Sequence, residues 1–290
     1  MSKALKFFFI SLFLSIPFWW GINLFNEKLE NYILAQISAP LENIIFVPPK
    51  RKPPLSLNAK SAISVKTNLE NFEKILFKKE EKTPLPIASL TKLMTALVVF
   101  EEGYDLKEEI LISKKASSQE DVPIFGNLKE GEKLKIEDLL ELSLVYSSND
   151  AAFALSEKVP NFVEKMNTLS QKLGMENTHF SNPTGVNSNY STAEDLVKLA
   201  KYILKNYPQI FEISRRPPKY KLDNGIYNIF VPKEIVGGKT GYTPEAGGCL
   251  LFIFRDEEQP NIFYINLILG ASSVQERVEE MQKLINWILS

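Results

Sequence analysis

The sequence is poor in the two side chains that supply most metal ligands and most catalytic bases. Its single cysteine, Cys249, excludes an intramolecular disulfide and a cysteine-based metal cluster. Its single histidine, His179, excludes a zinc site with several histidines, and a Ser-His-Asp triad would have to use that one residue. We therefore expect no metal and no cofactor, and a lysine becomes the more credible base for a serine nucleophile.

An excess of charge of one sign is also absent. The 34 lysines and arginines nearly balance the 35 aspartates and glutamates, so no nucleic acid is expected as a partner. A chain of 290 residues with 44% hydrophobic residues is long enough for one or two domains with a real core. Nothing in the composition indicates an oligomeric state.

The N-terminus carries the longest apolar stretch. Residues 7–25 are mostly apolar and aromatic, Lys3 and Lys6 precede them, and charged residues follow. About 20 such residues cross a bilayer, and the preceding lysines favour a cytoplasmic N-terminus with the rest exported. We predict that residues 1–26 form a single-pass anchor in the cell membrane and that the remainder is extracytoplasmic. A cleaved signal peptide is the alternative.

Residues 27–56 change to a mixed polar composition and then to a run of prolines and basic residues. Residues 48–54 include four prolines and three basic residues. Such a run cannot sustain a helix and has little apolar surface to bury. We predict a stiff, solvated stalk that leads to a globular domain at residues 57–290.

The globular part combines short apolar runs with amphipathic segments. Residues 59–66 and 74–79 predict an antiparallel pair of strands. Residues 246–254 and 263–269 predict two further strands, and residues 278–289 predict a closing amphipathic helix. We therefore expect an α+β fold with an antiparallel sheet flanked by helices.

The first stretch that suggests chemistry is Ala88-Ser89-Leu90-Thr91-Lys92, where a proline-containing loop runs into an apolar helical repeat. If Ser89 opens a helix, Lys92 lies on the same face, and its amine can point at the hydroxyl. A lysine can act as a base only as the neutral amine, which burial or a neighbouring cation favours. The alternative is an N-cap serine followed by a solvated lysine.

Two later clusters could complete such a site. Ser147 and Asn149 stand before an alanine-rich helix, where they would either cap that helix or lie at the edge of a cleft. Lys239, Thr240 and Gly241 stand among glycines before a predicted strand. There, a cation and a hydroxyl could hold a carboxylate, and backbone N–H groups could bind an oxyanion. The alternative for the cluster at Lys239 is a hairpin turn with an exposed lysine.

Taken together, the three clusters resemble the active-site motifs of penicillin-binding proteins and class A β-lactamases, in the same order along the chain. Their surroundings, with residues 173–180, are most similar to the D-alanyl-D-alanine carboxypeptidases of the low-molecular-mass penicillin-binding family. The resemblance covers about residues 57–290. It implies a β-lactamase/DD-peptidase-like fold, with the active site between an antiparallel sheet and a helical lobe. It also implies a serine-type carboxypeptidase that acts on the peptidoglycan pentapeptide and is inhibited by β-lactams.

The resemblance assigns roles to the residues of the first two motifs. Ser89 would be acylated at the terminal D-Ala-D-Ala bond, and Lys92 would be its general base. Ser147 would pass a proton toward the leaving amine. Asn149 would contact a substrate amide and help to hold Lys92.

The third motif would bind the rest of the substrate. Lys239 would supply positive charge, and Thr240, next to Gly241, would bind the terminal carboxylate. The backbone N–H groups of Ser89 and Tyr242 would form the oxyanion hole. Water would then hydrolyse the acyl-enzyme.

Three features depart from the family's usual pattern. Ser148 stands where Gly or Ala is usual, and Tyr146 stands where a smaller residue or proline is usual, so both could reshape the edge of the cleft. Ala271-Ser272 stands where some members carry an arginine near the substrate carboxylate. A peptidoglycan DD-endopeptidase therefore remains an alternative. A β-lactamase, for which no Glu-x-x-Leu-Asn-type loop is found, and a non-catalytic cell-wall-binding protein are the others.

Overall fold

A computed structural model describes residues 3–37, 52–119, 128–186, 188–218 and 226–290. The chain divides into two compact units, Met1–Lys52 and Pro53–Ser290. The division falls within the proline-rich run, whose sequence has little apolar surface to bury against either unit.

The smaller unit contains helix α1, Lys3–Ile37. The helix continues past residue 26 because no proline or glycine interrupts residues 27–37. No helix in the described part of the chain is both long enough and apolar enough to span a membrane, so the predicted membrane anchor is not found there. Residues 38–51 of the predicted stalk lie outside the described residues.

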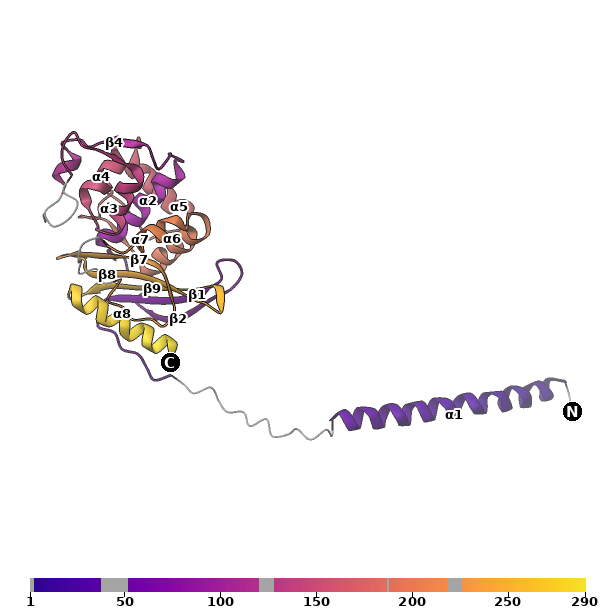
Figure 1. Ribbon diagram of the computed structural model, residues 1–290. Coiled ribbons are helices and arrows are strands. Elements are labelled where there is room, and N and C mark those ends of the chain that lie inside the picture. Colours follow the sequence, from indigo (N-terminus) through magenta and orange to yellow (C-terminus); the bar gives the residue numbers. More distant parts are fainter. Residues whose placement is uncertain (1–2, 38–51, 120–127, 187, 219–225) are drawn as a thin grey trace. The chain divides into compact units, whose positions relative to one another are not determined.

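The larger unit is built on a five-stranded sheet in the order β2-β1-β9-β8-β7 (Figure 1). Every pairing in this sheet is antiparallel. The four strands predicted from apolar runs are confirmed, and β7 is added beside β8 at one edge. The strands are β1 (Ser61–Thr67), β2 (Glu73–Lys79), β7 (Glu234–Thr243), β8 (Gly247–Asp256) and β9 (Gln259–Ala271).

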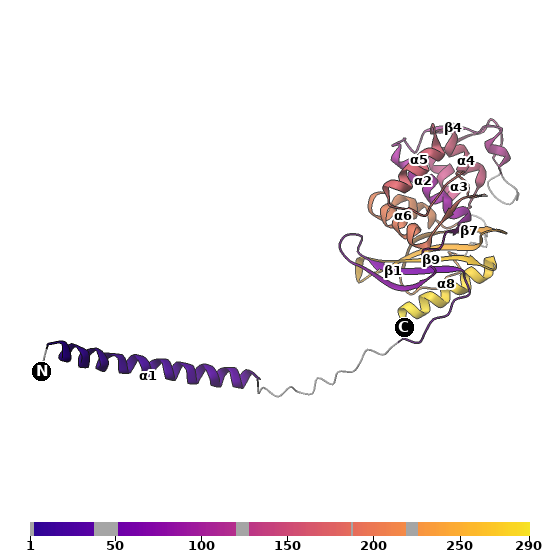
Figure 2. The same ribbon diagram turned by 180° about the vertical axis from the view of Figure 1, so that it is seen from behind.

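Helices cover both faces of this sheet. Helix α8 (Val274–Leu289) packs on β8 and β9, whereas helix α6 (Ala193–Asn206) packs on β1 and β9. Figures 1 and 2 show α8 on one side of the sheet and the other helices of this unit on the opposite side. Alternate residues of β8 therefore enter two cores: Phe252 lies in the core under α8, and Leu251 lies in the larger core. Because both faces are covered, β8 has an uninterrupted apolar run instead of an alternating pattern.

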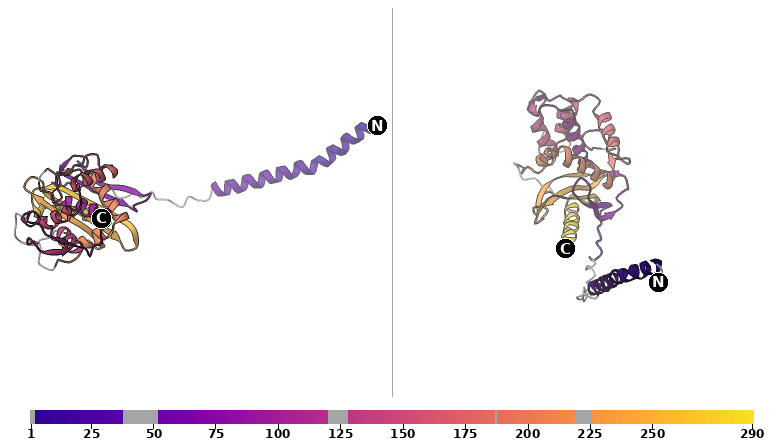
Figure 3. Two further views of the ribbon diagram at one scale, coloured as in Figure 1. Left: turned by 90° about the horizontal axis from the view of Figure 1, so that it is seen from above. Right: turned by 90° about the vertical axis from the view of Figure 1, so that its right-hand side faces the viewer.

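The helices on the second face form a lobe around α2 (Thr91–Glu101), which follows the 3₁₀ turn Ala88–Leu90 (Figure 3). Helix α2 is buried from Thr91 to Val99 because its sequence is apolar on most sides. The predicted α+β architecture, an antiparallel sheet flanked by helices with a helical lobe, is confirmed. The other helices of the lobe are α3 (Ile136–Leu144), α4 (Asn149–Glu157), α5 (Phe162–Lys172), α6 and α7 (Gln209–Ser214). The short strands are β3 (Leu85–Pro86), β4 (Glu109–Leu111), β5 (Lys133–Lys135) and β6 (Tyr190–Ser191).

Side-chain caps set where three of the helices begin. Ser148 caps α4, and Thr192 caps α6 by accepting the N–H of Asp195. Helix α8 begins before the predicted residue 278 because Ser273 accepts the N–H of Glu276 and starts the helix there. The cap at Ser148 makes Asn149 the first residue of α4.

Candidate active site

Ser89 and Lys92 form a pair at the entrance to α2. Ser89 lies in the 3₁₀ turn and is partly exposed, whereas Lys92 is 0% exposed. The Lys92 Nζ atom donates to Ser89 Oγ at 2.9 Å. The predicted spacing therefore brings the hydroxyl and the amine together, and the solvated-lysine alternative is wrong.

Two carbonyl oxygens also accept hydrogen bonds from this amine. The Lys92 Nζ atom donates at 2.7 Å to Asn149 Oδ1, at the first residue of α4, and at 2.7 Å to the backbone carbonyl of Thr184. The nitrogen thus joins α2, α4 and the loop that precedes β6. Sequence reasoning missed Thr184, because a backbone carbonyl can come from any residue type.

The loop that carries Thr184 is built by asparagine side chains. Asn182 Oδ1 accepts the backbone N–H of Thr184 at 3.1 Å and that of Gly185 at 2.8 Å. Asn189 Nδ2 donates to Thr91 Oγ1 at 3.0 Å, which ties the loop to the start of α2. The dense run of turn-forming residues around Asn182 was the available signal for this loop.

Gly185 allows this loop to lie directly on the turn that carries Ser89. Its φ is +91°, and a Cβ placed on it would lie 2.0 Å from the carbonyl oxygen of Ala88. Ala88 itself has a φ of +46°, which is uncommon for a residue with a side chain. Two backbone segments are therefore held in a close contact that only glycine permits.

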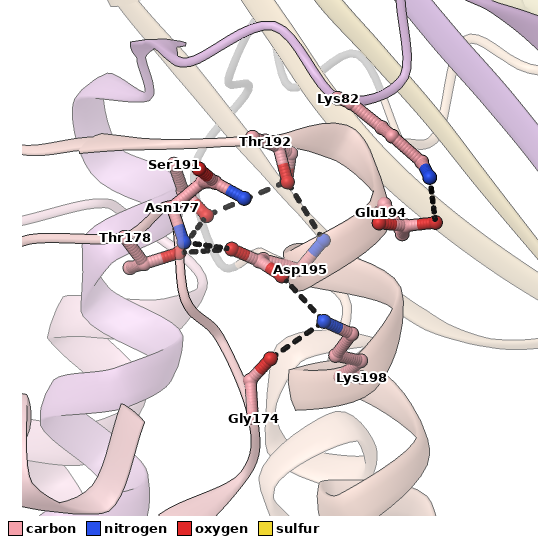
Figure 4. Close-up of polar contacts among 9 residues, drawn as sticks. All are labelled: Lys82, Gly174, Asn177, Thr178, Ser191, Thr192, Glu194, Asp195 and Lys198. Atoms are coloured by element: carbon pink, nitrogen blue, oxygen red, sulfur yellow. Dashed lines mark hydrogen bonds and ion pairs between the residues drawn. The ribbon is translucent and has the colours of Figure 1, made fainter. Parts of the chain in front are cut away.

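Both ends of the loop region are tied to α6 through Asp195, which is 0% exposed (Figure 4). Its carboxylate accepts the backbone N–H of Asn177 at 2.9 Å and the Thr178 hydroxyl at 3.0 Å. It also accepts Lys198 Nζ at 2.7 Å, and its own N–H is donated to Thr192 Oγ1. A buried carboxylate with several donors is a rigid support for the backbone around it.

The single histidine is part of this support and not of the amine cluster. The backbone N–H and C=O of His179 pair with Tyr190 at 2.9 and 3.1 Å, and its ring packs on the Tyr190 ring with centroids 5.7 Å apart. None of the three hydrogen bonds of the Lys92 amine described above goes to this ring. His179 is thus held by a backbone bridge to Tyr190.

Ser147 adopts a strained conformation at the start of α4. Its φ is +64°, a region that costs a residue with a side chain about 1–2 kcal/mol. The strain turns Ser147 Oγ to accept from Lys239 Nζ at 2.9 Å. Ser148 takes the capping role instead: it is 1% exposed, and its Oγ accepts the N–H of Ala151. Ser148 therefore does not reshape the edge of a cleft, because its side chain is buried in the cap.

Lys239 lies within strand β7 and is 1% exposed, so the hairpin-turn alternative with an exposed lysine is wrong. Its Nζ also donates to the carbonyl of Thr240 at 2.9 Å. Burial lowers the pKa of Lys239 well below its usual value, and the positive charges of Lys92 and Arg277 lower it further. Several cationic groups thus face one another, an arrangement suited to an anionic ligand.

Strand β7 runs directly past Ser89. A Cβ on Gly241 would lie 3.0 Å from the backbone nitrogen of Ser89, so the absence of a side chain lets the strand and the turn approach this closely. Thr240 is partly exposed, and Tyr242 is 46% exposed at the end of the same strand. Within the described ranges, no group of three or more His, Cys, Asp or Glu side chains could hold a metal ion.

The three predicted clusters therefore meet from distant parts of the sequence, and a family model fits them. The model for D-alanyl-D-alanine carboxypeptidases (Peptidase_S11) matches residues 48–272. The chain belongs to the D-alanyl-D-alanine carboxypeptidase family. This membership confirms the resemblance seen in the three motifs.

Individual relatives of the family agree with this assignment. The chain is 31% identical over 260 residues to D-alanyl-D-alanine carboxypeptidase DacF of Bacillus subtilis, which covers 83% of this chain and 64% of that protein. The chain thus spans slightly less than two thirds of the length of this relative. It is 32% identical over 264 residues to a D-alanyl-D-alanine endopeptidase of Pseudomonas aeruginosa, covering 83% of this chain and 81% of that protein.

Solved structures of the family share the fold. Penicillin-binding protein D2 from Listeria monocytogenes in its ampicillin-bound form matches with a TM-score of 0.69 and 26% identity. The match covers 82% of this chain and 100% of that chain. The five-stranded antiparallel sheet with its helical lobe is therefore the DD-peptidase fold of the penicillin-binding proteins.

Proposed function

We propose that this chain is a serine-type D-Ala-D-Ala carboxypeptidase that removes the terminal D-alanine from peptidoglycan stem peptides outside the cytoplasm. One observation carries the proposal: the buried Lys92 amine lies 2.9 Å from Ser89 Oγ and 2.7 Å from two carbonyl oxygens. A nucleophile within reach of a base, with that base oriented by further groups, is the arrangement that activates a serine.

The partners of Lys92 also set the direction of proton transfer. The Asn149 and Thr184 oxygens can only accept hydrogen bonds, so they take two N–H groups of the amine. In the neutral amine, the remaining tetrahedral position is the lone pair, which then faces Ser89 Oγ. Lys92 would take the hydroxyl proton as Ser89 Oγ forms a bond to the carbonyl carbon of the penultimate D-alanine.

The negative charge that develops on the carbonyl oxygen needs donors. The backbone N–H groups of Ser89 and Tyr242 are the proposed pair, and the close approach of Gly241 to the Ser89 nitrogen supports their convergence. Removal of one such donor typically costs about 10²–10³ in rate.

Breakdown of the tetrahedral intermediate requires a proton on the leaving nitrogen. Ser147 Oγ, held 2.9 Å from Lys239 Nζ, is the proposed relay, and D-alanine leaves as the C–N bond breaks. Lys239 and the Thr240 hydroxyl would bind the terminal carboxylate, and Asn149 would contact a substrate amide. Water then attacks the Ser89 ester, which returns the serine and the shortened peptide.

The test is D-alanine release from a peptide that ends in L-Lys-D-Ala-D-Ala, measured with the full chain and its Ser89→Ala variant. Release by the wild type alone supports the proposal. In parallel, intact mass after incubation with penicillin should show one adduct in the wild type and none in the variant. Absence of both release and adduct in the wild type would overturn the assignment.

A DD-endopeptidase is the second candidate. The observations that favour it are the endopeptidase name of the Pseudomonas aeruginosa relative and the lack of an arginine at Ala271-Ser272. Without that cation, binding is weakened most for a substrate whose free carboxylate follows the scissile bond. A cross-linked substrate, whose chain continues past that bond, is affected less. Cleavage of a cross-linked muropeptide dimer faster than release of D-alanine from the monomer would select this alternative.

A further inference from the structure

The arginine that approaches the predicted site comes from behind the sheet. Arg277 lies in the first part of α8, on the face opposite the helical lobe (Figures 1 and 2). Its side chain is buried, with 4% of the residue exposed, and its Nη1 donates to the backbone carbonyl of Gly241 at 2.8 Å. A cation is thus bound to the strand that passes Ser89.

The packing of α8 on β8 makes this reach possible. A Cβ on Gly248 would lie 2.5 Å from the carbonyl oxygen of Ser273 and 2.9 Å from the Cβ of Arg277. The missing side chain at Gly248 lets the beginning of α8 lie against the strand backbone. Gly248 pairs with Tyr242 across the β7–β8 ladder, so Arg277 arrives at the peptide that joins Gly241 to Tyr242.

The C=O and the N–H of this peptide have different partners. In a planar trans peptide, the C=O of Gly241 and the N–H of Tyr242 point in opposite directions. Arg277 reaches the carbonyl from the β8 side, so the N–H points away from β8. Since β7 is last in the order of the sheet, this N–H points to the open edge, and the Ser89 turn lies beside it, on the face to which a Cβ of Gly241 would point.

We propose that Arg277 is a positioning residue of the oxyanion hole: it holds the peptide between Gly241 and Tyr242 in register and polarises the Tyr242 N–H toward the substrate. A charged donor on the carbonyl withdraws electron density from the amide, which strengthens the N–H at its other end as a hydrogen-bond donor. The inference rests on the proposed acylation of Ser89.

The charge of Arg277 also affects the pKa of Lys239. Together with burial and Lys92, it lowers the pKa of Lys239. Loss of the Arg277 charge should therefore raise that pKa and move the alkaline limb of substrate binding to higher pH. The position of this limb reports the charge of Arg277, and the acylation rate reports its effect on the Tyr242 N–H.

The experiment compares Arg277→Met and Arg277→Lys with the wild-type full chain. The measured quantities are the second-order rate of Ser89 acylation by a fluorescent penicillin, and kcat and KM for D-alanine release. We expect Arg277→Met to lower the acylation rate and kcat about 10- to 100-fold with little change in KM, because the donor is weakened and not removed. Arg277→Lys, which keeps the charge, should recover most of the rate and the wild-type pH profile.

Glu280→Gln is the matched structural control. Glu280 is also fully buried in α8, but its carboxylate accepts the backbone N–H groups of Asn58 and Ala59, which precede β1. This variant should lose stability and keep its rate per folded molecule. If Arg277→Met behaves like Glu280→Gln, with an unchanged rate per folded molecule and an unmoved pH profile, the inference is overturned. If the wild type is neither acylated nor active, the proposed function fails instead.

Discussion

The contact between Gly185 and Ala88 offers a sharp test of how backbone packing supports the site. Replacing Gly185 with alanine would place a methyl carbon 2.0 Å from the Ala88 carbonyl oxygen, whereas ordinary contacts begin at 3.4 Å. Because the neighbouring atoms are backbone, the loop and the turn have to separate by about 1.4 Å, the difference between these two distances. That displacement carries the Thr184 carbonyl away from Lys92, and the Ser89 turn away from β7.

The size of the effect follows from two separate terms. Alanine at a φ of +91° costs about 1–2 kcal/mol of stability, and the overpacking adds about 1–3 kcal/mol. A misplacement of about 1 Å between reacting groups can cost about 10²-fold in rate. We therefore expect Gly185→Ala to be destabilised by about 2–5 kcal/mol and to acylate about 100-fold more slowly.

Gly103→Ala separates the two terms. Gly103 has a φ of +72°, and a Cβ placed on it would meet nothing within 4 Å. This control should show only the conformational cost, with an unchanged rate of acylation by fluorescent penicillin. Urea unfolding gives the stability of each variant, and the acylation rate is compared at equal folded fraction. Acylation of Gly185→Ala at the wild-type rate would refute the argument that this contact positions Ser89 and Lys92.

Three further outcomes are expected. Lys239→Met should abolish D-alanine release but raise stability by about 1–4 kcal/mol at neutral pH, because a buried charge is removed. The difference in unfolding free energy between this variant and the wild type should shrink as the pH rises toward 10.5. The pKa of Lys239 is lowered in the folded wild type, so the lysine deprotonates there first and the cost of burying its charge disappears. Equal urea midpoints of variant and wild type at pH 7 would contradict this. Asn149→Ala removes one acceptor from Lys92 and should slow acylation about 10²-fold, and a rate within twofold of wild type would exclude Asn149 from orienting the base. Burial raises the pKa of Cys249 to about 11, so iodoacetamide at pH 8 should label this thiol only after unfolding, and rapid labelling of native protein would contradict that burial.

Some of the site could be predicted from local sequence because its geometry is local. Ser89 and Lys92 are one helical turn apart, so helix formation alone brings the hydroxyl and the amine to 2.9 Å. The strands β1, β2, β8 and β9 follow from side chains that lie next to one another in the chain. The strand character of Lys239 was not predicted, because the glycines around it obscure the hydrophobic period. Helices α5 and α7 were not predicted either, although Phe162, Met166 and Leu169 of α5 recur at helical spacing.

The contacts that complete the site depend on backbone and on long-range packing. Ser147 and Lys239 meet across 92 residues, and the Thr184 carbonyl meets Lys92 across 92 residues. Spacing in sequence carries no information about such distances, and a carbonyl oxygen has no residue-type signature. The left-handed φ of Ser147 likewise could not be predicted, because serine rarely adopts this conformation.

Residue types and their short-range spacing were thus enough to name the nucleophile, its neighbouring amine and the family of the fold, because these depend on one helix and on three recognisable motifs. Only the tertiary structure brings the Thr184 carbonyl to this amine, buries Lys239 in β7 and brings Arg277 through the gap at Gly248 to the Gly241 carbonyl. The physical reason is that these groups meet only when both faces of the sheet are covered. Their close approach depends on glycines, because a side chain at those positions would keep the packed segments apart.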